Sequence, residues 1–361
     1  MEFEPVIGLE VHVQLNTRSK IFCGCSTTYK SEPNSQTCPV CLGLPGVLPV
    51  LNEEALRKAI MAGLALNATV AEYSKFDRKN YFYPDLPKAY QISQYDKPIC
   101  SGGFVELTTS TGTKKIGITR LHLEEDAGKS IHSDEPGNRV SYLNFNRTGV
   151  PLAEIVSEPD IRSAEEAYEY LQNLKTIMKY LDVSDCNMEE GSLRCDVNIS
   201  LREKGVDKFG EKVEVKNLNS FKAVKTAIEY EMRRQAEILE DGGRIIQETR
   251  LWDADRGLSF SMRSKEEAHD YRYFPDPDLP PIKPDPEYIA RIRESIPELP
   301  ESRKERFVAE YGLSPYDAGV LTSARPLAEY FESTVKNGAI PKKASNWIQS
   351  ELLAKIENPE N

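Results

Sequence analysis

The chain has 361 residues, more than the roughly 250–300 at which a single hydrophobic core stops growing, so its length predicts two or three domains. Its net charge of −11 argues against a protein that holds nucleic acid by bulk electrostatics, and any nucleic acid would have to meet local patches. No apolar run reaches the roughly 18–20 residues of a membrane span and the N-terminus lacks a secretion signal, so we expect a cytoplasmic protein.

The first predicted element is a strand over residues 6–15, VIGLEVHVQL, in which apolar and polar side chains alternate. Its apolar face consists of Ile7, Leu9, Val11, Val13 and Leu15. On the other face Glu10 and His12 project in the same direction, which is half of a metal or acid/base site. A solvated strand face that carries these two residues by chance is the alternative.

Four cysteines follow in a stretch rich in Ser, Thr, Pro and Gly: Cys23, Cys25, Cys38 and Cys41. In a reducing compartment they do not imply disulfides. Two close pairs separated by a loop fit a tetrahedral site, so we predict a structural zinc knuckle over residues 23–41. Free thiols, a redox pair and an iron–sulfur site are the alternatives.

After the knuckle, Asn52 is the predicted N-cap of a helix with Glu53 and Glu54 in its first turn. The segment 75–95 has no clean period and is dense in Tyr, Asp, Lys and Arg around two prolines. We interpret it as a binding loop, with an ordinary surface loop as the alternative.

Strands return at residues 118–124, 143–145 and 152–156, and the last of them carries Glu154. Ser163 and Glu166 form a capping box before an apolar helix. Residues 192–202 and 212–216 alternate like the first strand. Their outward residues include Arg194, Asp196 and Lys216.

This repeated alternation predicts an antiparallel sheet with helices on one face and a polar face for substrate on the other. A long helix is expected over 220–239 and a strand over 245–252. The proline-rich passage from His269 to about Pro286 indicates a domain boundary, and residues 287–361 read as short helices.

Seven collinear stretches between about residues 5 and 285 resemble the B subunit of the aspartyl/glutamyl-tRNA amidotransferases, the GatB family. They are VIGLEVHVQL, KFDRKNYFYPDLPKAYQIS, LHLEEDAGKS, PLAEIVSEPD, MEEGSLRCDVNISLR, VKNLNSF and HDYRYFPDPDLPP. The resemblance implies an α+β fold with an antiparallel-sheet cradle of the glutamine synthetase-like type. It places this cradle in residues 1–290 and a small all-α domain in 291–361. Family members continue past NWIQSELL into a further helical domain, and we expect that domain to be absent here.

The resemblance also implies ATP-dependent activation of Glu-tRNA(Gln), Asp-tRNA(Asn) or both, followed by amidation. Partners would be an amidase (glutaminase) A subunit, a small C subunit and misacylated tRNA, in a heterotrimer with channelled ammonia. Zinc cysteines occur in part of the family, and all four are present here.

The family's motif carboxylates match Glu10, Glu125 and Glu154, which would bind Mg²⁺ with His12 beside them. Strand parity turns Glu125 away from Glu124, so a bulge is needed to aim it and Glu124 is the alternative ligand. Arg194, Asp196 and Lys216 would meet phosphate or ribose of ATP. An ammonia channel or gate would be formed by Lys79, Tyr81, Asp85 and Lys88.

Two other hypotheses come from different classes. A zinc-bearing RNA-binding module would use the knuckle and the tyrosines but leaves the carboxylates without a purpose. A free-standing ligase of the glutamine synthetase kind would act on a small amino acid.

Overall fold

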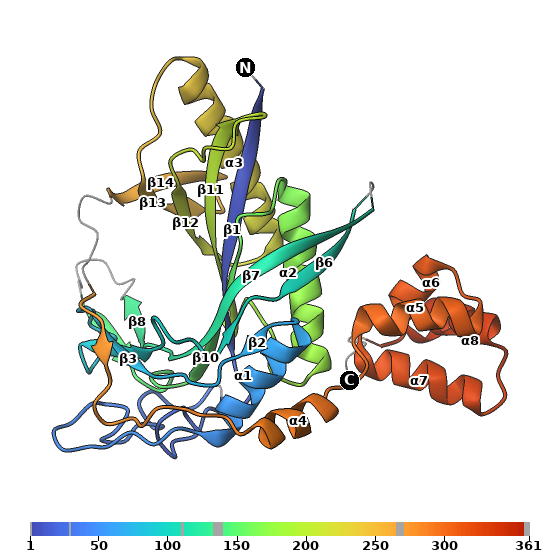
Figure 1. Cartoon of the computed structure of the whole chain (residues 1–361), viewed down its shortest axis with the longest axis horizontal. Coiled ribbons are helices and arrows are strands. Elements are labelled where there is room, and N and C mark those ends of the chain that lie inside the picture. Colours follow the sequence, from blue (N-terminus) through green and yellow to red (C-terminus); the bar gives the residue numbers. More distant parts are fainter. Residues whose placement is uncertain (1, 29, 110–111, 133–139, 265–270, 357–361) are drawn as a thin grey trace.

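The computed structural model describes residues 2–28, 30–109, 112–132, 140–264 and 271–356 (Figure 1). Its main sheet has ten strands: β1 (Phe3–Gln14), β2 (Thr69–Val70), β5 (Cys100–Ser101), β6 (Phe104–Thr109), β7 (Gly112–Glu125), β10 (Pro151–Ser157), β11 (Leu193–Glu203), β12 (Val213–Leu218), β13 (Glu248–Asp253) and β14 (Leu258–Ser264). The order is β14-β13-β12-β11-β1-β10-β7-β5-β2, and β6 pairs with β7.

Three helices pack on this sheet: α1 (Glu53–Ala65), α2 (Ala164–Tyr180) and α3 (Phe221–Glu240). Residues of all three belong to the same hydrophobic core as the strands. In Figure 1, α2 and α3 lie along one face of the sheet. The predicted combination of a large sheet with helices on one face is confirmed.

The sheet is mixed, so the prediction of an antiparallel sheet is wrong at one pair of strands. β12 and β13 run parallel, with Glu214 opposite Thr249, whereas the other neighbouring strands of the main sheet are antiparallel. The reason is α3, which connects β12 to β13. This helix carries the chain back to the end of the sheet where β12 began, as a parallel connection requires.

The predicted first strand is confirmed in β1, at the centre of the sheet between β10 and β11. The predicted core residues between positions 7 and 13 of this strand are fully buried, and Leu15, one residue past its end, is 2% exposed. Its polar residues Glu10, His12 and Gln14 are half-buried on the opposite face. β1 therefore separates the hydrophobic core from the polar face of the sheet.

The predicted helix caps are also confirmed. The Asn52 side chain accepts hydrogen bonds from the backbone amides of Glu54 and Ala55 at the start of α1. Ser163 accepts from the Glu166 amide at the start of α2, and the Glu166 carboxylate accepts from the amide of Arg162, one residue before the cap. Both groups satisfy amides that would otherwise lack partners.

The segment 75–95, predicted as a loop, contains β3 (Asp77–Asn80) and β4 (Tyr90–Ser93). They form a three-stranded sheet with β15 (Phe274–Pro275) in the order β15-β3-β4. Arg78 on β3 pairs with Asp276 and Asp278, at 2.8 and 2.9 Å. Because β15 lies nearly 200 positions after β3, the pattern of residues within 75–95 cannot predict this sheet. His269, at the start of the predicted boundary passage, lies outside the described residues.

The remaining strands, β8 (Lys129–His132) and β9 (Ser141–Asn144), form a hairpin. The C-terminal helices are α4 (Pro286–Glu294), α5 (Pro300–Tyr311), α6 (Pro315–Leu321), α7 (Arg325–Lys336), α8 (Pro341–Trp347) and a π-helical turn (Ile348–Leu352). α4 buries Ile292 in the large core, while a second core begins at Phe307. Figure 1 shows α5–α8 gathered beside the sheet.

The second core is joined to α2 by polar contacts. The Tyr180 hydroxyl donates to the Thr322 carbonyl at 2.7 Å, and Arg325 donates to the Tyr180 carbonyl at 3.2 Å. Within the described residues, no helix is both long and apolar enough to cross a membrane.

We expect Asn52→Ala to lower the free energy of unfolding by about 1 kcal/mol, because it removes the α1 cap. It also removes an amide that donates to the Ser19 carbonyl at 3.0 Å. Asn52→Asp keeps the capping oxygen and loses only the second contact. Urea unfolding of the three proteins separates the two effects, and equal losses for both variants would contradict a capping role.

Candidate active site

A cavity of about 440 Å³ lies over the polar face of the sheet. Its lining includes residues from β1, β7, β10, β11 and β12, and the small sheet contributes Lys79. The acidic and imidazole side chains that line it are Glu10, His12, His122, Glu124, Glu154, Asp196 and Glu214. This face therefore has the chemistry of a site for cations and charged substrates.

The first group in the cavity is set by strand register. His12 on β1 lies opposite Glu154 on β10, and Glu154 lies opposite His122 on β7. Glu124 is two residues farther along β7 and so shares the face of His122. His12 Nε2 is 3.4 Å from Glu154 Oε2 and 3.6 Å from Glu124 Oε1.

Opposite charges dominate the electrostatics of this group. Burial disfavours the charged form of His122, but Glu154 and Glu124 outweigh it and raise its pKa to about 9. Burial likewise opposes the Glu154 anion, yet His122 and His12 hold the pKa of Glu154 well below its ordinary value. Ligand atoms of His12, Glu124 and Glu154 lie within 4.8 Å of one another, so these three can share one cation.

A second group lies beside the first. Glu10 on β1 is opposite Asp196 on β11, and Glu214 on β12 completes a set of ligand atoms within 4.8 Å of one another. The Lys216 ammonium lies 2.5 Å from Asp196 and 3.0 Å from Glu214. Asn198 donates to Glu10 at 2.8 Å. Three carboxylates, two of which pair with one lysine, still carry net negative charge, which suits a second divalent cation.

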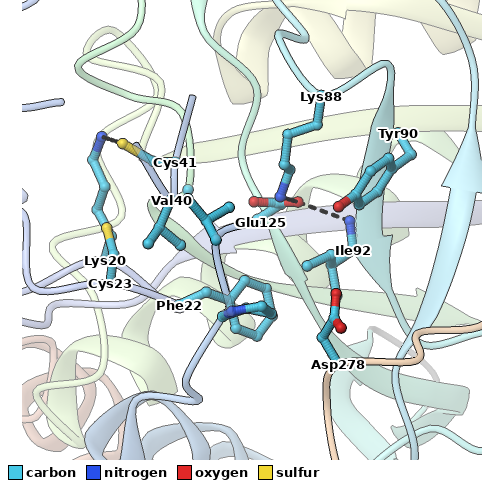
Figure 2. A pocket seen from close by; sticks show the side chains of 13 residues that line it. Lys20, Phe22, Cys23, Val40, Cys41, Lys88, Tyr90, Ile92, Glu125 and Asp278 are labelled. Atoms are coloured by element: carbon cyan, nitrogen blue, oxygen red, sulfur yellow. Dashed lines mark hydrogen bonds and ion pairs between the residues drawn. The ribbon is translucent and has the colours of Figure 1, made fainter. Parts of the chain in front are cut away.

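The structure does not bring Glu125 to these groups. Its carboxylate accepts from the Ile92 amide at 2.8 Å and pairs with Lys88, in a separate small pocket (Figure 2). β7 is regular here, with Glu125 opposite Pro151, so alternation turns Glu125 away from the cavity and aims Glu124 into it. Among the predicted carboxylates, Glu124 therefore takes the place expected of Glu125.

The four predicted magnesium ligands are thus divided among three places. His12 and Glu154 share the first group with Glu124, Glu10 belongs to the second group, and Glu125 faces Lys88.

Of the three residues predicted to contact phosphate or ribose, two line the cavity and one does not. Asp196 and Lys216 line the cavity. Arg194 instead donates to both carboxylate oxygens of Asp126, at 3.1 and 3.2 Å, an ion pair beside the cavity. Lys79 lines the cavity 4.8 Å from the centre of the Tyr271 ring. Burial disfavours its ammonium, but Glu124 and other groups outweigh burial and raise its pKa.

Sequence reasoning missed two residues of these groups. His122 has the parity of Glu124 within the predicted strand 118–124, which was the available signal. Glu214 alternates with Val213 and Val215 and so has the parity of Lys216, but this pattern alone gives it no role. Only the pairing of β11 with β12 brings it to Glu10.

The cysteine cluster is assembled as its spacing predicts. Cys23, Cys25, Cys38 and Cys41 place their sulfurs within 4.8 Å of one another, and all are free of disulfides. The pKa of Cys41 is lowered to about 4, chiefly by a hydrogen bond with Cys23. The Cys38 amide and the charge of Lys20 act in the same direction, whereas burial opposes them. A thiolate in a ring of four sulfurs fits tetrahedral zinc.

Neighbouring residues on β7 offer a matched pair of variants. We expect Glu124→Gln to weaken Mn²⁺ binding about tenfold or more, because it removes an anionic oxygen from a three-residue group. Glu125→Gln changes the same charge one residue away and should leave Mn²⁺ affinity unchanged. Electron paramagnetic resonance of free Mn²⁺ measures both. A loss only in Glu125→Gln would contradict the assignment.

Comparison with known proteins identifies the family of this chain. The model of the GatB/GatE catalytic domain matches residues 5–290. The aspartyl/glutamyl-tRNA(Asn/Gln) amidotransferase B subunit of Carboxydothermus hydrogenoformans is 61% identical, over 98% of this chain and 73% of the relative. The B subunits of Caldicellulosiruptor bescii and Thermodesulfovibrio yellowstonii are 60% and 58% identical over 98% of this chain, and 73% and 74% of their own lengths are covered. The chain therefore belongs to the family of aspartyl/glutamyl-tRNA(Asn/Gln) amidotransferase B subunits.

Proposed function

We propose that this chain uses ATP to activate the side-chain carboxylate of Glu-tRNA(Gln), Asp-tRNA(Asn) or both, and that ammonia then converts it to the amide. The products would be Gln-tRNA(Gln) and Asn-tRNA(Asn). The observation that carries the proposal is the pair of acidic groups that share one cavity.

A carboxylate is a poor electrophile because its leaving group would be oxide. In the proposed first step a carboxylate oxygen attacks the γ-phosphorus of ATP, so that an acyl phosphate forms and ADP leaves. Ammonia then attacks the acyl carbon, phosphate leaves with the electron pair, and a base takes one ammonia proton. Both steps need a site that excludes water.

The residues of the cavity fit the charges of these reactants. His12, Glu124 and Glu154 would hold one divalent cation, and Glu10, Asp196 and Glu214 would hold another. Such cations, Mg²⁺ in our proposal, neutralise phosphate charge. Lys216 holds Asp196 and Glu214 in place, which keeps the second set preorganised.

Ammonia would come from glutamine at a partner amidase, and a small third protein would complete a heterotrimer in the cytoplasm. We propose that ammonia reaches the cavity past Lys79, Tyr81, Asp85 and Lys88. The position of Lys79 in the lining of the cavity supports this, and Lys88 lies in the neighbouring small pocket, where it pairs with Glu125.

Within the architecture, we propose that residues 1–290 form a cradle of the glutamine synthetase-like type and that 291–361 form a helical domain. We further propose that the four cysteines bind one structural zinc. The closed set of four sulfurs supports a structural ion, because a catalytic zinc keeps one position open.

The decisive test of function supplies the assembled complex with ATP and each misacylated tRNA. We expect ATP hydrolysis to require charged tRNA, and amide formation from glutamine to require the amidase partner. Ammonium chloride should replace both glutamine and that partner, since only the ammonia source is missing.

Three outcomes would contradict the proposal. ATP hydrolysis stimulated by free glutamate would favour a small-molecule ligase, and charged-tRNA binding without hydrolysis would favour an RNA-binding module. Glutamine-dependent product from the isolated chain would refute the need for a partner.

The zinc cluster yields a separate prediction through Lys20, which is fully buried. Its ammonium donates to Cys41 Sγ at 3.5 Å (Figure 2). It also donates to the Gln36 and Phe145 carbonyls, at 2.8 and 3.3 Å. Four thiolates around Zn²⁺ carry a net charge of about −2, which this lysine halves. We expect Lys20→Met to weaken zinc binding by about 10- to 100-fold, as loss of an outer contact does in other metal sites.

Lys58→Met is the matched control. Lys58 is also buried, but its ammonium donates to the Asp182 carbonyl. Chelator competition on both variants gives zinc affinity directly. Equal zinc affinities for the two variants would contradict the role of Lys20, whereas absence of zinc from the unaltered protein would contradict the site itself.

A further inference from the structure

One wall of the cavity is aromatic, and the chemistry above gives it no role. Tyr95, Tyr271 and Tyr273 line the cavity beside Lys79. The rings of Tyr95 and Tyr273 are stacked, with centroids 4.2 Å apart and planes 9° from parallel. Tyr271 meets Tyr273 edge to face at 6.0 Å.

The backbone under these rings is fixed. The Tyr95 amide donates to the Asp77 carboxylate at 3.0 Å. The Asn80 backbone and side-chain amides both donate to the Tyr271 carbonyl, at 2.9 and 3.1 Å. The rings therefore stand on two segments, one after β4 and one before β15, that are tied to β3 by hydrogen bonds.

The residue between the two later tyrosines is strained. Arg272 has φ of 44°, in the left-handed region that non-glycine residues rarely adopt. The Asn80 side chain donates to its carbonyl at 2.8 Å, which helps to hold this conformation. Strain of this kind is maintained where the surroundings over-determine the backbone, often at ligand sites.

Tyr95 also leaves a flat surface open. It is 60% exposed although it lines the cavity, so the ring face not covered by Tyr273 is available to a ligand. Flat aromatic surfaces bind nucleobases by stacking, without selecting among them by hydrogen bonds. The cations Arg120 and Lys212 line the same cavity and can meet phosphate oxygens.

We propose that Tyr95 and Tyr273 form a stacking platform for the adenine base of a substrate. The inference rests on the proposed function, whose two substrates both carry adenosine: ATP, and the 3′-terminal nucleotide of the charged tRNA. The base lies on the tyrosines at the rim of the cavity, while phosphate or the aminoacyl group extends to the acidic groups on the sheet.

Kinetics of the assembled amidotransferase, with ammonium chloride as donor, assign the base to its source. Tyr95→Ala raises the KM of one adenosine substrate by about 5- to 150-fold, the range expected for one lost stacking contact, and leaves kcat nearly unchanged. A rise for ATP alone identifies the nucleotide, and a rise for charged tRNA alone identifies the terminal adenosine. Tyr95→Phe keeps the ring and keeps the KM.

Tyr330→Ala is the control, because Tyr330 is 46% exposed on α7 and does not line the cavity. A second measurement does not depend on turnover. ATP and tRNA probes that carry 2-aminopurine in place of adenine lose fluorescence when the base stacks. Quenching by the unaltered full chain that Tyr95→Ala abolishes, and Tyr95→Phe and Tyr330→Ala retain, supports the platform.

The outcomes separate the two proposals. Quenching without amide formation leaves the platform intact and contradicts the proposed reaction. Amide formation with both KM values unchanged in Tyr95→Ala, or the absence of quenching with either probe, overturns the platform.

Discussion

The site depends on one constraint, that a strand can direct a side chain only to one face or the other of its sheet. β1 occupies the middle of the sheet, and each of its core residues commits a neighbour to the opposite face. Register with β10 and β11 then decides which polar residues meet. His12 meets Glu154 on one side and Arg194 on the other, while Glu10 meets Asp196. The packing of the core and the position of the carboxylates are therefore a single property of the sheet.

The same arrangement concentrates charge. Glu124 and Glu154 are both nearly buried, which is unfavourable for two anions unless cations are near. The protein supplies part of that compensation itself, through His12 and His122 in one group and Lys216 in the other. In each group the carboxylate residues still line the cavity, which supports the proposed cations.

The sequence predicts local features well because they depend on neighbouring residues. The faces of β1 and the caps Asn52 and Ser163 follow from alternation and from amides at helix starts. The cysteine cluster follows from spacing. Contacts that depend on register could not be predicted in the same way. Family motifs marked Glu125, whereas simple parity selected Glu124, and the structure follows parity. The direction of β13 and the small sheet under residues 75–95 needed partners far along the chain.

Adjacent residues Glu124 and Glu125 also make β7 a partition one peptide thick. On one side lies the large cavity, and on the other lies the pocket of Lys88, which extends to Cys23 and Cys41. A deletion or insertion of one residue within the strand would exchange the two compartments' carboxylates, whereas a change of two residues would restore each to its side. The length of this strand is thus fixed in its parity. The cavity and the small pocket share no lining residue, yet a shift of β7 by one residue would alter both.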